Sequence, residues 1–413
     1  MKLAGNKQLG VGQHLALGFQ HLFAMFGATV LVPLLTGFDP AVALFTSGSG
    51  TLLFILITQG KVPAYLGSSF AFIAPIISVA SVWGPEYALG GGVAVGLVYA
   101  LVALLIARLG TDWIDKVLPP VVIGSVIMVI GLGLAGTAVE MAGFTDGGSL
   151  ANVDVRIALF TLIVTVIGTM FFKGFFAVVP ILVGIIAGYI FALLNGAVDF
   201  TPVREAAWIG LPRFMAPKFS WTAIAMMLPV SLVSITEHLG DVLVLSRITG
   251  KQFYKDPGLH RTLLGDGLAT AWAGLWGGPP NTTYGENVGV LAITGIFNVS
   301  VIAVAAAFAV AISFIQKFGA LISTIPSPVM GGVSIVLFGV IAASGIRTLV
   351  EAGIDYGDKR NLVISSVILV LGIGGAQLGF GEVKLHGMAL AAVVGIILNL
   401  ILPKNGTSKA DAS

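Results

Sequence analysis

Four acidic residues lie in or beside long apolar stretches, where a charge is unusual. They are Glu237, Asp241, Asp266 and Glu286. An ionisable side chain at membrane depth is expensive, so it marks a functional site by default. A carboxylate in such surroundings favours binding of a proton. The first chemistry that the sequence indicates is therefore proton exchange inside an apolar protein.

Glu237 and Asp241 are four positions apart, so in a helix they share one face, with Ser234 one turn earlier. Two neighbouring carboxylates repel each other, which favours protonation of the pair. His238 follows Glu237 but points about 100° away around the helix. We interpret His238 as a packing or hydrogen-bonding residue and, with Asp266, as a secondary candidate for proton coupling. The alternative is a cluster of hydrogen bonds that holds helices together.

Glu286 lies in the stretch Gly277–Gly289, which reads GGPPNTTYGENVG. Pro279 and Pro280 remove two backbone donors and disfavour helix before them. Interrupted backbone between apolar runs is stable only where it is buried in protein or lines a cavity. The stretch therefore predicts a broken membrane segment that borders a site, and the alternative is an irregular loop at the membrane surface.

The composition indicates an integral membrane protein. The chain has 413 residues, of which 57% are hydrophobic and 10% charged, and its mean hydropathy is +1.01. A helical span needs about 20 residues, and about fourteen apolar segments meet that need or approach it. These segments are 14–35, 40–58, 69–82, 88–107, 118–139, 157–172, 175–194, 221–245, 262–277, 284–297, 299–316, 328–346, 361–379 and 387–402.

The net charge and the cysteine content limit the possible binding partners, and the distribution of Lys and Arg predicts the orientation in the membrane. A net charge of +2 does not indicate nucleic acid, and the absence of cysteine excludes disulfides and thiol chemistry. With fourteen spans and the N-terminus inside, 15 of the 21 Lys and Arg residues fall in inside loops. This asymmetry predicts that both termini are cytoplasmic.

The chain resembles itself at a fixed offset. Gln20–Leu22 matches Glu237–Leu239 at an offset of 217 positions, and the broken stretch Pro63–Phe70 corresponds to the start of the tenth segment. The other matches are Gly50 with Gly267, Gly60 with Gly277, Pro63 with Pro280, and, at an offset of 208, Pro120, Gly124 and Gly131 with Pro328, Gly332 and Gly339. Seven spans per half make the second repeat inverted. Inverted repeats with interrupted helices are typical of secondary transporters, whose half-helices direct N-terminal amides at a substrate.

Two other classes of protein compete with a transporter. Glu237, His238 and Asp241 superficially resemble metal ligands of a membrane enzyme, but the chain has no HExxH motif, five His and no Cys. We therefore predict no enzyme activity and no metal. A channel would need rings or filters of repeated donors. Two carboxylates that meet two half-helix ends indicate one closed binding site instead.

At these residues the chain resembles the uracil permease branch of the nucleobase/ascorbate transporter family. The resemblance covers nearly the whole chain. It lies in Gln20–Pro33, Pro63–Pro75, Thr236–Asp241, Asp256–Arg261, Pro279–Val290 and Pro326–Arg347. It implies an all-α membrane fold of fourteen spans in two inverted repeats of seven, with a short β-strand that interrupts spans three and ten.

The same resemblance implies a division into a core and a gate domain. The core domain would comprise 1–110 (spans one to four) and 220–320 (spans eight to eleven). The gate domain would comprise 111–219 (spans five to seven) and 321–403 (spans twelve to fourteen). The polar residues 404–413 would form a disordered tail.

The resemblance also implies a substrate site. Glu237 and Glu286 would accept hydrogen bonds from pyrimidine N–H groups, and the backbone amides of Phe70 and Gly285 would hold the carbonyl oxygens. Phe70 or Tyr284 would cover the ring face. Ser69 and Phe338 are further candidates for the lining.

Three positions bear on the choice of substrate. Uracil-type members can have His where this chain has Asp241, and purine-transporting members have Asp there. Purine transporters usually have Gln at the position of Glu286, which favours uracil. Phe338 stands where uracil-type members can have Tyr.

We therefore expect a bacterial inner-membrane symporter of uracil, or a close pyrimidine, with protons. The core domain would move against the gate domain like an elevator within the bilayer, and Glu237 and Asp241 would bind the proton. No cofactor is expected, and family members tend to form homodimers. The alternatives are a proton-coupled permease for purines such as xanthine or uric acid, and a channel.

Overall fold

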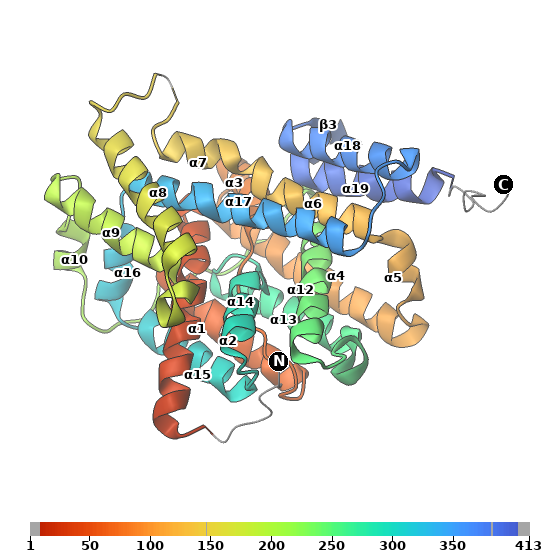
Figure 1. Cartoon of the computed structure of the whole chain (residues 1–413), viewed down its shortest axis with the longest axis horizontal. Coiled ribbons are helices and arrows are strands. Elements are labelled where there is room, and N and C mark those ends of the chain that lie inside the picture. Colours follow the sequence, from red (N-terminus) through yellow and green to blue (C-terminus); the bar gives the residue numbers. More distant parts are fainter. Residues whose placement is uncertain (1–8, 146, 381–382, 404–413) are drawn as a thin grey trace.

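The computed structural model describes residues 9–145, 147–380 and 383–403, and it consists mostly of helices (Figure 1). The predicted tail 404–413 lies outside the described residues. Within the described part, seven helices are long and apolar enough to cross a membrane, or eight if a pair bent by 87° is one span. The predicted class of helical membrane protein is confirmed.

One group of helices, which we call the first bundle, combines segments from both halves of the chain. It contains α1 (Val11–Thr36), α2 (Pro40–Ile57), α3 (Ile73–Trp83), α4 (Pro85–Leu109), α11 (Trp221–Met227), α12 (Val230–Thr249), α13 (Leu259–Trp276), α14 (Gly285–Thr294), α15 (Val299–Ser313) and α16 (Gln316–Ser323). Helix α13 packs on α4 and α2, and α15 packs on α1 and α2. Most of these helices fill the lower part of Figure 1.

The second bundle also draws on both halves. It contains α6 (Pro120–Gly133), α7 (Ala135–Met141), α8 (Val153–Phe171), α9 (Pro180–Leu194), α17 (Ser327–Glu351), α18 (Lys359–Ile373) and α19 (Gly387–Ile401). Helix α17 packs on α6, α7 and α8, while α18 and α19 pack on α6 and on each other. Two short helices, α5 (Asp112–Val117) and α10 (Thr201–Glu205), lie in connections between the bundles.

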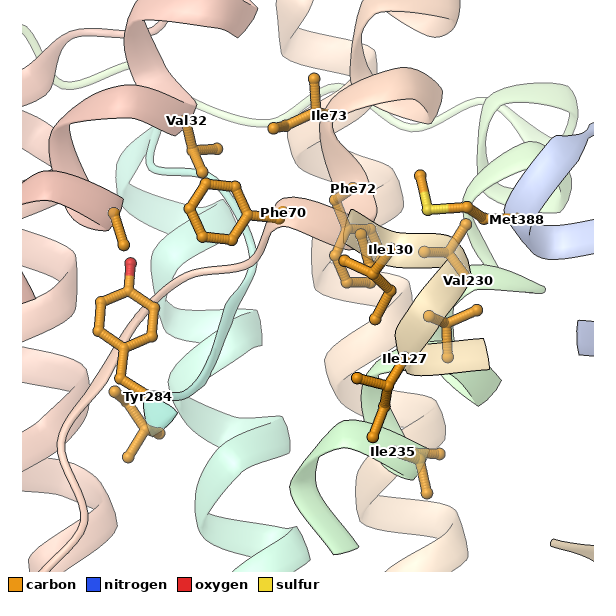
Figure 2. Close-up of a cluster of buried hydrophobic side chains, with 14 of the residues drawn as sticks. Val32, Phe70, Phe72, Ile73, Ile127, Ile130, Val230, Ile235, Tyr284 and Met388 are labelled. Carbon is orange, nitrogen blue, oxygen red and sulfur yellow. The ribbon is translucent and has the colours of Figure 1, made fainter. Parts of the chain in front are cut away.

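The two bundles meet along an apolar surface. Helix α12 of the first bundle contacts α6 and α19 of the second. Figure 2 shows Ile127 and Ile130 of α6 close to Phe72, Val230 and Ile235 of the first bundle, and all five side chains are buried. Burial of apolar side chains stabilises this contact without a directional preference.

The linker 195–220 between the two halves packs on the first bundle. Gln316 Nε2 donates to the carbonyl of Leu211 at 2.6 Å, and Lys317 Nζ donates to the carbonyl of Val203 at 2.7 Å. The ring of Phe214 lies with its centroid 5.0 Å from that of Phe45. The linker is thus attached by polar and aromatic contacts to α16 and α2.

Two pairs of short strands accompany the helices. β1 (Leu66–Ser68) pairs antiparallel with β2 (Asn281–Thr283), with Gly67 opposite Thr282. β3 (Gln377–Phe380) pairs antiparallel with β4 (Val383–His386). The hairpin β3–β4 was not predicted.

The apolar segment 361–379 differs most from its expected form, because it is not helical to its end. Its helix, α18, ends at Ile373. Gly374 and Gly375 follow, and Gly375 has a φ of 64°, which an L side chain rarely adopts. The chain then turns into β3, so the end of this predicted span is a strand.

Glycine allows close contact between helices inside each bundle. A Cβ added to Gly96 of α4 would lie 2.4 Å from the carbonyl oxygen of Gly267 on α13. A Cβ added to Gly267 would lie 2.4 Å from Cβ of Tyr99. Small residues at helix crossings let backbones approach, which is how helices associate where solvent cannot drive them together.

This contact predicts the effect of one methyl group at two glycines. Gly96→Ala should lower the stability by about 1–3 kcal/mol, because the added Cβ forces α4 and α13 apart. Gly339→Ala is the matched control, since nothing lies within 4 Å of an added Cβ in the middle of α17. Thermal unfolding in detergent should show a lower midpoint for Gly96→Ala and an equal or higher one for Gly339→Ala. Equal midpoints for the two variants would contradict the packing argument.

Candidate functional site

Two half-helices begin beside the β1–β2 pair. After β1 the chain enters the short 3-10 helix η1 (Phe70–Phe72) and then α3; after β2 it enters α14. Phe70 is therefore the first helical residue after β1, and Gly285 is the first after β2. The first turn of a helix presents amides that have no partner within the helix, so both half-helices begin with polar groups near the same strand pair.

Side chains of the first bundle hold the strands. Ser47 Oγ donates to the carbonyl of Leu66 at 2.6 Å, and Thr51 Oγ1 accepts from Leu66 N at 2.9 Å. Asn281 Nδ2 donates to the carbonyls of Thr46 and Ala269 at 3.1 and 3.3 Å. The fully buried Asn281 therefore joins α2 and α13 through the start of β2.

Tyr284 lies against β1 rather than in open space. Its amide donates to the carbonyl of Tyr65 at 3.0 Å, and its hydroxyl donates to the carbonyl of Ser68 at 3.0 Å. The ring occupies the place where a side chain at Gly67 would lie, 2.5 Å from an added Cβ. Thr29 of α1 donates to the same hydroxyl at 3.2 Å. The predicted role of Tyr284 in covering a substrate ring stays a prediction.

Glu237 and Asp241 of α12 both reach β2. Thr282 Oγ1 lies 3.5 Å from Glu237 Oε2, at the limit of a hydrogen bond, and Thr283 Oγ1 donates to Asp241 Oδ2 at 2.7 Å. Both carboxylates are partly buried. The predicted shared face of α12 is therefore the face that borders β2 and the start of α14.

Glu286 is the second residue of α14, in its first turn, and is partly buried. A carboxylate at a helix N-terminus is stabilised by the aligned peptide dipoles. The next residue, Asn287, donates to the carbonyl of His21 at 3.0 Å and lies 3.2 Å from His21 Nδ1. These contacts fix the first turn of α14 to α1.

His238 and Asp266 form a second polar contact, between α12 and α13. His238 Nδ1 is 3.1 Å from Asp266 Oδ2, and His238 Nε2 is 3.1 Å from Thr262 Oγ1. His238 and Asp266 are fully buried between α12 and α13. The secondary candidates for proton coupling thus contact each other between α12 and α13, whereas Glu237 and Asp241 contact β2.

Phe70 and Phe338 bring the two bundles together at the site. Their ring centroids are 5.6 Å apart with an interplanar angle of 85°, an edge-to-face contact. Phe338 comes from α17 of the second bundle, and Figure 2 shows Phe70 projecting from the start of η1. Ser69 is fully buried, and its amide donates to the carbonyl of Pro280 at 2.9 Å.

The arrangement combines carboxylate acceptors with helix N-terminal amides. Glu237 and Glu286 accept hydrogen bonds, whereas the amides at Phe70 and Gly285 belong to first turns and donate. Such a set complements a small neutral molecule that alternates N–H groups and carbonyl oxygens. Among the described residues, no group of three or more His, Asp or Glu side chains has the geometry of a metal site.

Sequence reasoning did not identify the threonines that bond the carboxylates. Thr282 and Thr283 lie in the broken stretch, but the sequence analysis predicts no contact between them and the carboxylates. Their position between Pro280 and Glu286 could have indicated a polar contact, because hydroxyls in a broken membrane segment need hydrogen-bond partners. The choice of partner depends on where α12 lies, which a single sequence does not state.

Comparison with known proteins supports the expected family. The model of the Permease family matches residues 12–379. The uracil permease of Bacillus subtilis (strain 168) is 54% identical over 410 residues, which cover 96% of this chain and 94% of that protein. The uracil permease of Escherichia coli (strain K12) is 48% identical over 391 residues, which cover 94% and 91%.

Solved structures show the fold. The transmembrane domain of the cyanobacterial bicarbonate transporter BicA superposes with a TM-score of 0.63 at 17% identity, covering 96% of this chain and 98% of that one. SLC26A9 superposes with a TM-score of 0.72 at 13% identity, covering 94% of this chain and 64% of that one. The chain therefore belongs to the nucleobase/ascorbate transporter family of permeases, and it is a multi-pass membrane transporter rather than an enzyme.

Proposed function

We propose that the protein transports uracil, or a close pyrimidine, into the cell. The relatives named uracil permease at 54% and 48% identity support this substrate. The main structural support is the position of two acidic side chains: Glu237 approaches β2 from α12, and Glu286 begins α14 directly after β2.

Each polar edge of uracil has a partner in this proposal. Glu237 and Glu286 accept hydrogen bonds from the two ring N–H groups, and the amides of Phe70 and Gly285 donate to the carbonyl oxygens. Phe70 covers one ring face, while Ser69, Tyr284 and Phe338 line the surroundings. Gly285 has open space around it apart from Asp241 Oδ1, 3.8 Å from an added Cβ.

We propose the fourteen-span topology with two inverted repeats for this chain. Each of the fourteen apolar segments contains a helix in the structure. The helices α3 and α14, in segments three and ten, are 11 and 10 residues long and each follows a strand. Half-length helices that meet at strands are what a broken span requires, because paired strands satisfy the backbone where the helix stops.

We further propose that the two bundles are the moving parts of an elevator. The first bundle corresponds to the core domain (1–110 and 220–320) and the second to the gate domain (111–219 and 321–403). The linker 195–220 packs on the first bundle, so its final part would move with the core domain. The apolar surface shown in Figure 2 supports sliding, because dispersion contacts are non-directional.

Proton coupling is the driving force we propose, with Glu237 and Asp241 as the proton-binding pair. Two carboxylates on one helix face share few positive partners, so binding of a proton relieves their repulsion. The protein would lie in the bacterial inner membrane with both termini in the cytoplasm, and family members tend to be homodimers. No cofactor other than the coupling proton is required.

A proton-coupled purine permease is the second candidate. Asp241 favours it, because purine-transporting members have Asp at this position. Glu286 and the names of the relatives favour uracil. A binding assay with uracil, thymine, xanthine, uric acid and ascorbate separates the two candidates.

The first functional prediction concerns Glu286→Gln. Replacement of the carboxylate by an amide removes a charged acceptor and presents a donor to a ring N–H. We expect the affinity for uracil to fall by about ten- to a hundredfold, the worth of a hydrogen bond to a charged group. Isothermal titration of the purified protein measures it.

Glu140→Gln is the matched control for this prediction, since Glu140 is exposed on α7, outside the site. Its affinity for uracil should equal that of the unaltered protein. Unchanged uracil affinity in Glu286→Gln, with xanthine still excluded, would remove the main support for the substrate assignment.

The second functional prediction concerns the coupling ion. In proteoliposomes with an alkaline interior, a gradient of one pH unit should drive accumulation of uracil up to about tenfold for one proton per uracil. A protonophore should abolish this accumulation because it collapses the gradient. Equal accumulation driven by a sodium gradient without a pH gradient would show that the proton is not the coupling ion.

A further inference from the structure

Thr283 connects the predicted proton site to the predicted substrate site. It is the last residue of β2, and its Oγ1 donates to Asp241 Oδ2 at 2.7 Å. The chain continues from Thr283 through Tyr284 into the first turn of α14. No role assigned above uses the Thr283 side chain.

Asp241 faces the turn between β2 and α14 with both oxygens. Oδ2 accepts from Thr283, and Oδ1 lies 3.8 Å from the place of a Cβ on Gly285. The carboxylate therefore spans the turn that positions the Gly285 amide and Glu286. A change in the hydrogen bond between Asp241 and Thr283 therefore affects the position of this turn.

We propose that Thr283 is a positioning residue that transmits the protonation state of Asp241 to the first turn of α14. An ionised carboxylate only accepts hydrogen bonds, so Thr283 must donate to it. A protonated Asp241 has a donor of its own, and the Thr283 hydroxyl is then able to turn and accept. Proton binding thus changes the bond that holds the substrate-binding turn. This inference rests on the proposed uracil transport.

Other ionisable groups surround Asp241, so a variant at a carboxylate does not isolate this bond. Glu237 lies one turn earlier on α12, Glu286 lies in the first turn of α14, and Asp266 of α13 contacts His238 of α12. A change at Thr283 removes one hydrogen bond and leaves every charge in place.

The test compares three variants at this position. Thr283→Val and Thr283→Ala remove the hydroxyl, and Thr283→Ser keeps it. The pH dependence of uracil uptake into proteoliposomes is measured for each, together with the uracil affinity of the purified protein at one acidic pH. Monodisperse elution in detergent establishes that each variant is folded. If Thr283→Val does not fold, Thr283→Ala alone tests the loss of the hydroxyl.

Loss of the hydroxyl removes a donor that favours the ionised carboxylate, so Asp241 keeps its proton to higher pH. We expect the alkaline limb of the uptake profile to move upward by about half to one pH unit in the Val and Ala variants. The affinity at acidic pH should change by less than about threefold, because the bond between protonated Asp241 and the Thr283 hydroxyl joins two neutral groups and is weaker than the bond to the carboxylate. Thr283→Ser should retain the original profile.

Thr294→Val is the control, because among the described residues the Thr294 hydroxyl bonds only nearby backbone: it donates to the carbonyl of Val290 at 2.8 Å and accepts from the amide of Ile296 at 3.4 Å. An unchanged profile in folded Val or Ala variants would overturn the role of Thr283. So would an equal shift in Thr283→Ser or in Thr294→Val, since packing rather than the hydroxyl would then be responsible. Absence of uracil uptake by the unaltered protein would overturn the proposed substrate itself.

Discussion

The requirement that every backbone group be hydrogen-bonded at membrane depth is the constraint on which this structure depends. The stretches around Pro63 and Pro280 cannot form continuous helices, so their amides and carbonyls need other partners. Antiparallel pairing of β1 with β2 supplies partners for the strand residues, Ser47 and Thr51 bond the carbonyl and the amide of Leu66, and Thr270 donates to the carbonyl of Asn281. Two sequence defects in opposite halves thereby become one small sheet, which neither half is able to form alone.

The strand pair determines how the first bundle is assembled. Because one strand comes from each half, α1–α4 and α12–α15 must surround the same sheet. Close glycine contacts, such as Gly96 with Gly267, let α4 and α13 approach without large side chains between them. Helix α12 then lies alongside β2, and its two carboxylates meet hydroxyls of the strand. The position of the site therefore depends on the hydrogen bonding of the strand backbone as much as on the acidic residues.

Much of this organisation follows from local sequence rules. Pro, Gly and an isolated acid at 277–289 predict a broken segment, and the four-residue spacing of Glu237 and Asp241 predicts a shared face. The helix in each apolar segment follows from hydropathy. Partner choice does not follow: the pairing of His238 with Asp266 and of Thr283 with Asp241 depends on how α12 lies between α13 and β2. The hairpin β3–β4 was missed because its residues extend an apolar run, and only Gly374 and Gly375 indicate the stop.

The contacts between the bundles differ in kind from those within the first bundle. Between the bundles, Phe70 meets Phe338 edge to face, and Arg247 of α12 forms an exposed ion pair with Glu351 of α17. Exposed ion pairs contribute about 0–1 kcal/mol, and apolar contacts have little directional preference, so relative displacement costs little. The strand pair and its buried hydrogen bonds lie wholly within the first bundle, where breaking them would leave unpaired polar groups. In the proposed elevator, a molecule held by Glu237, Glu286 and the two half-helix amides would move with the first bundle as one unit, while the surface against the second bundle rearranges.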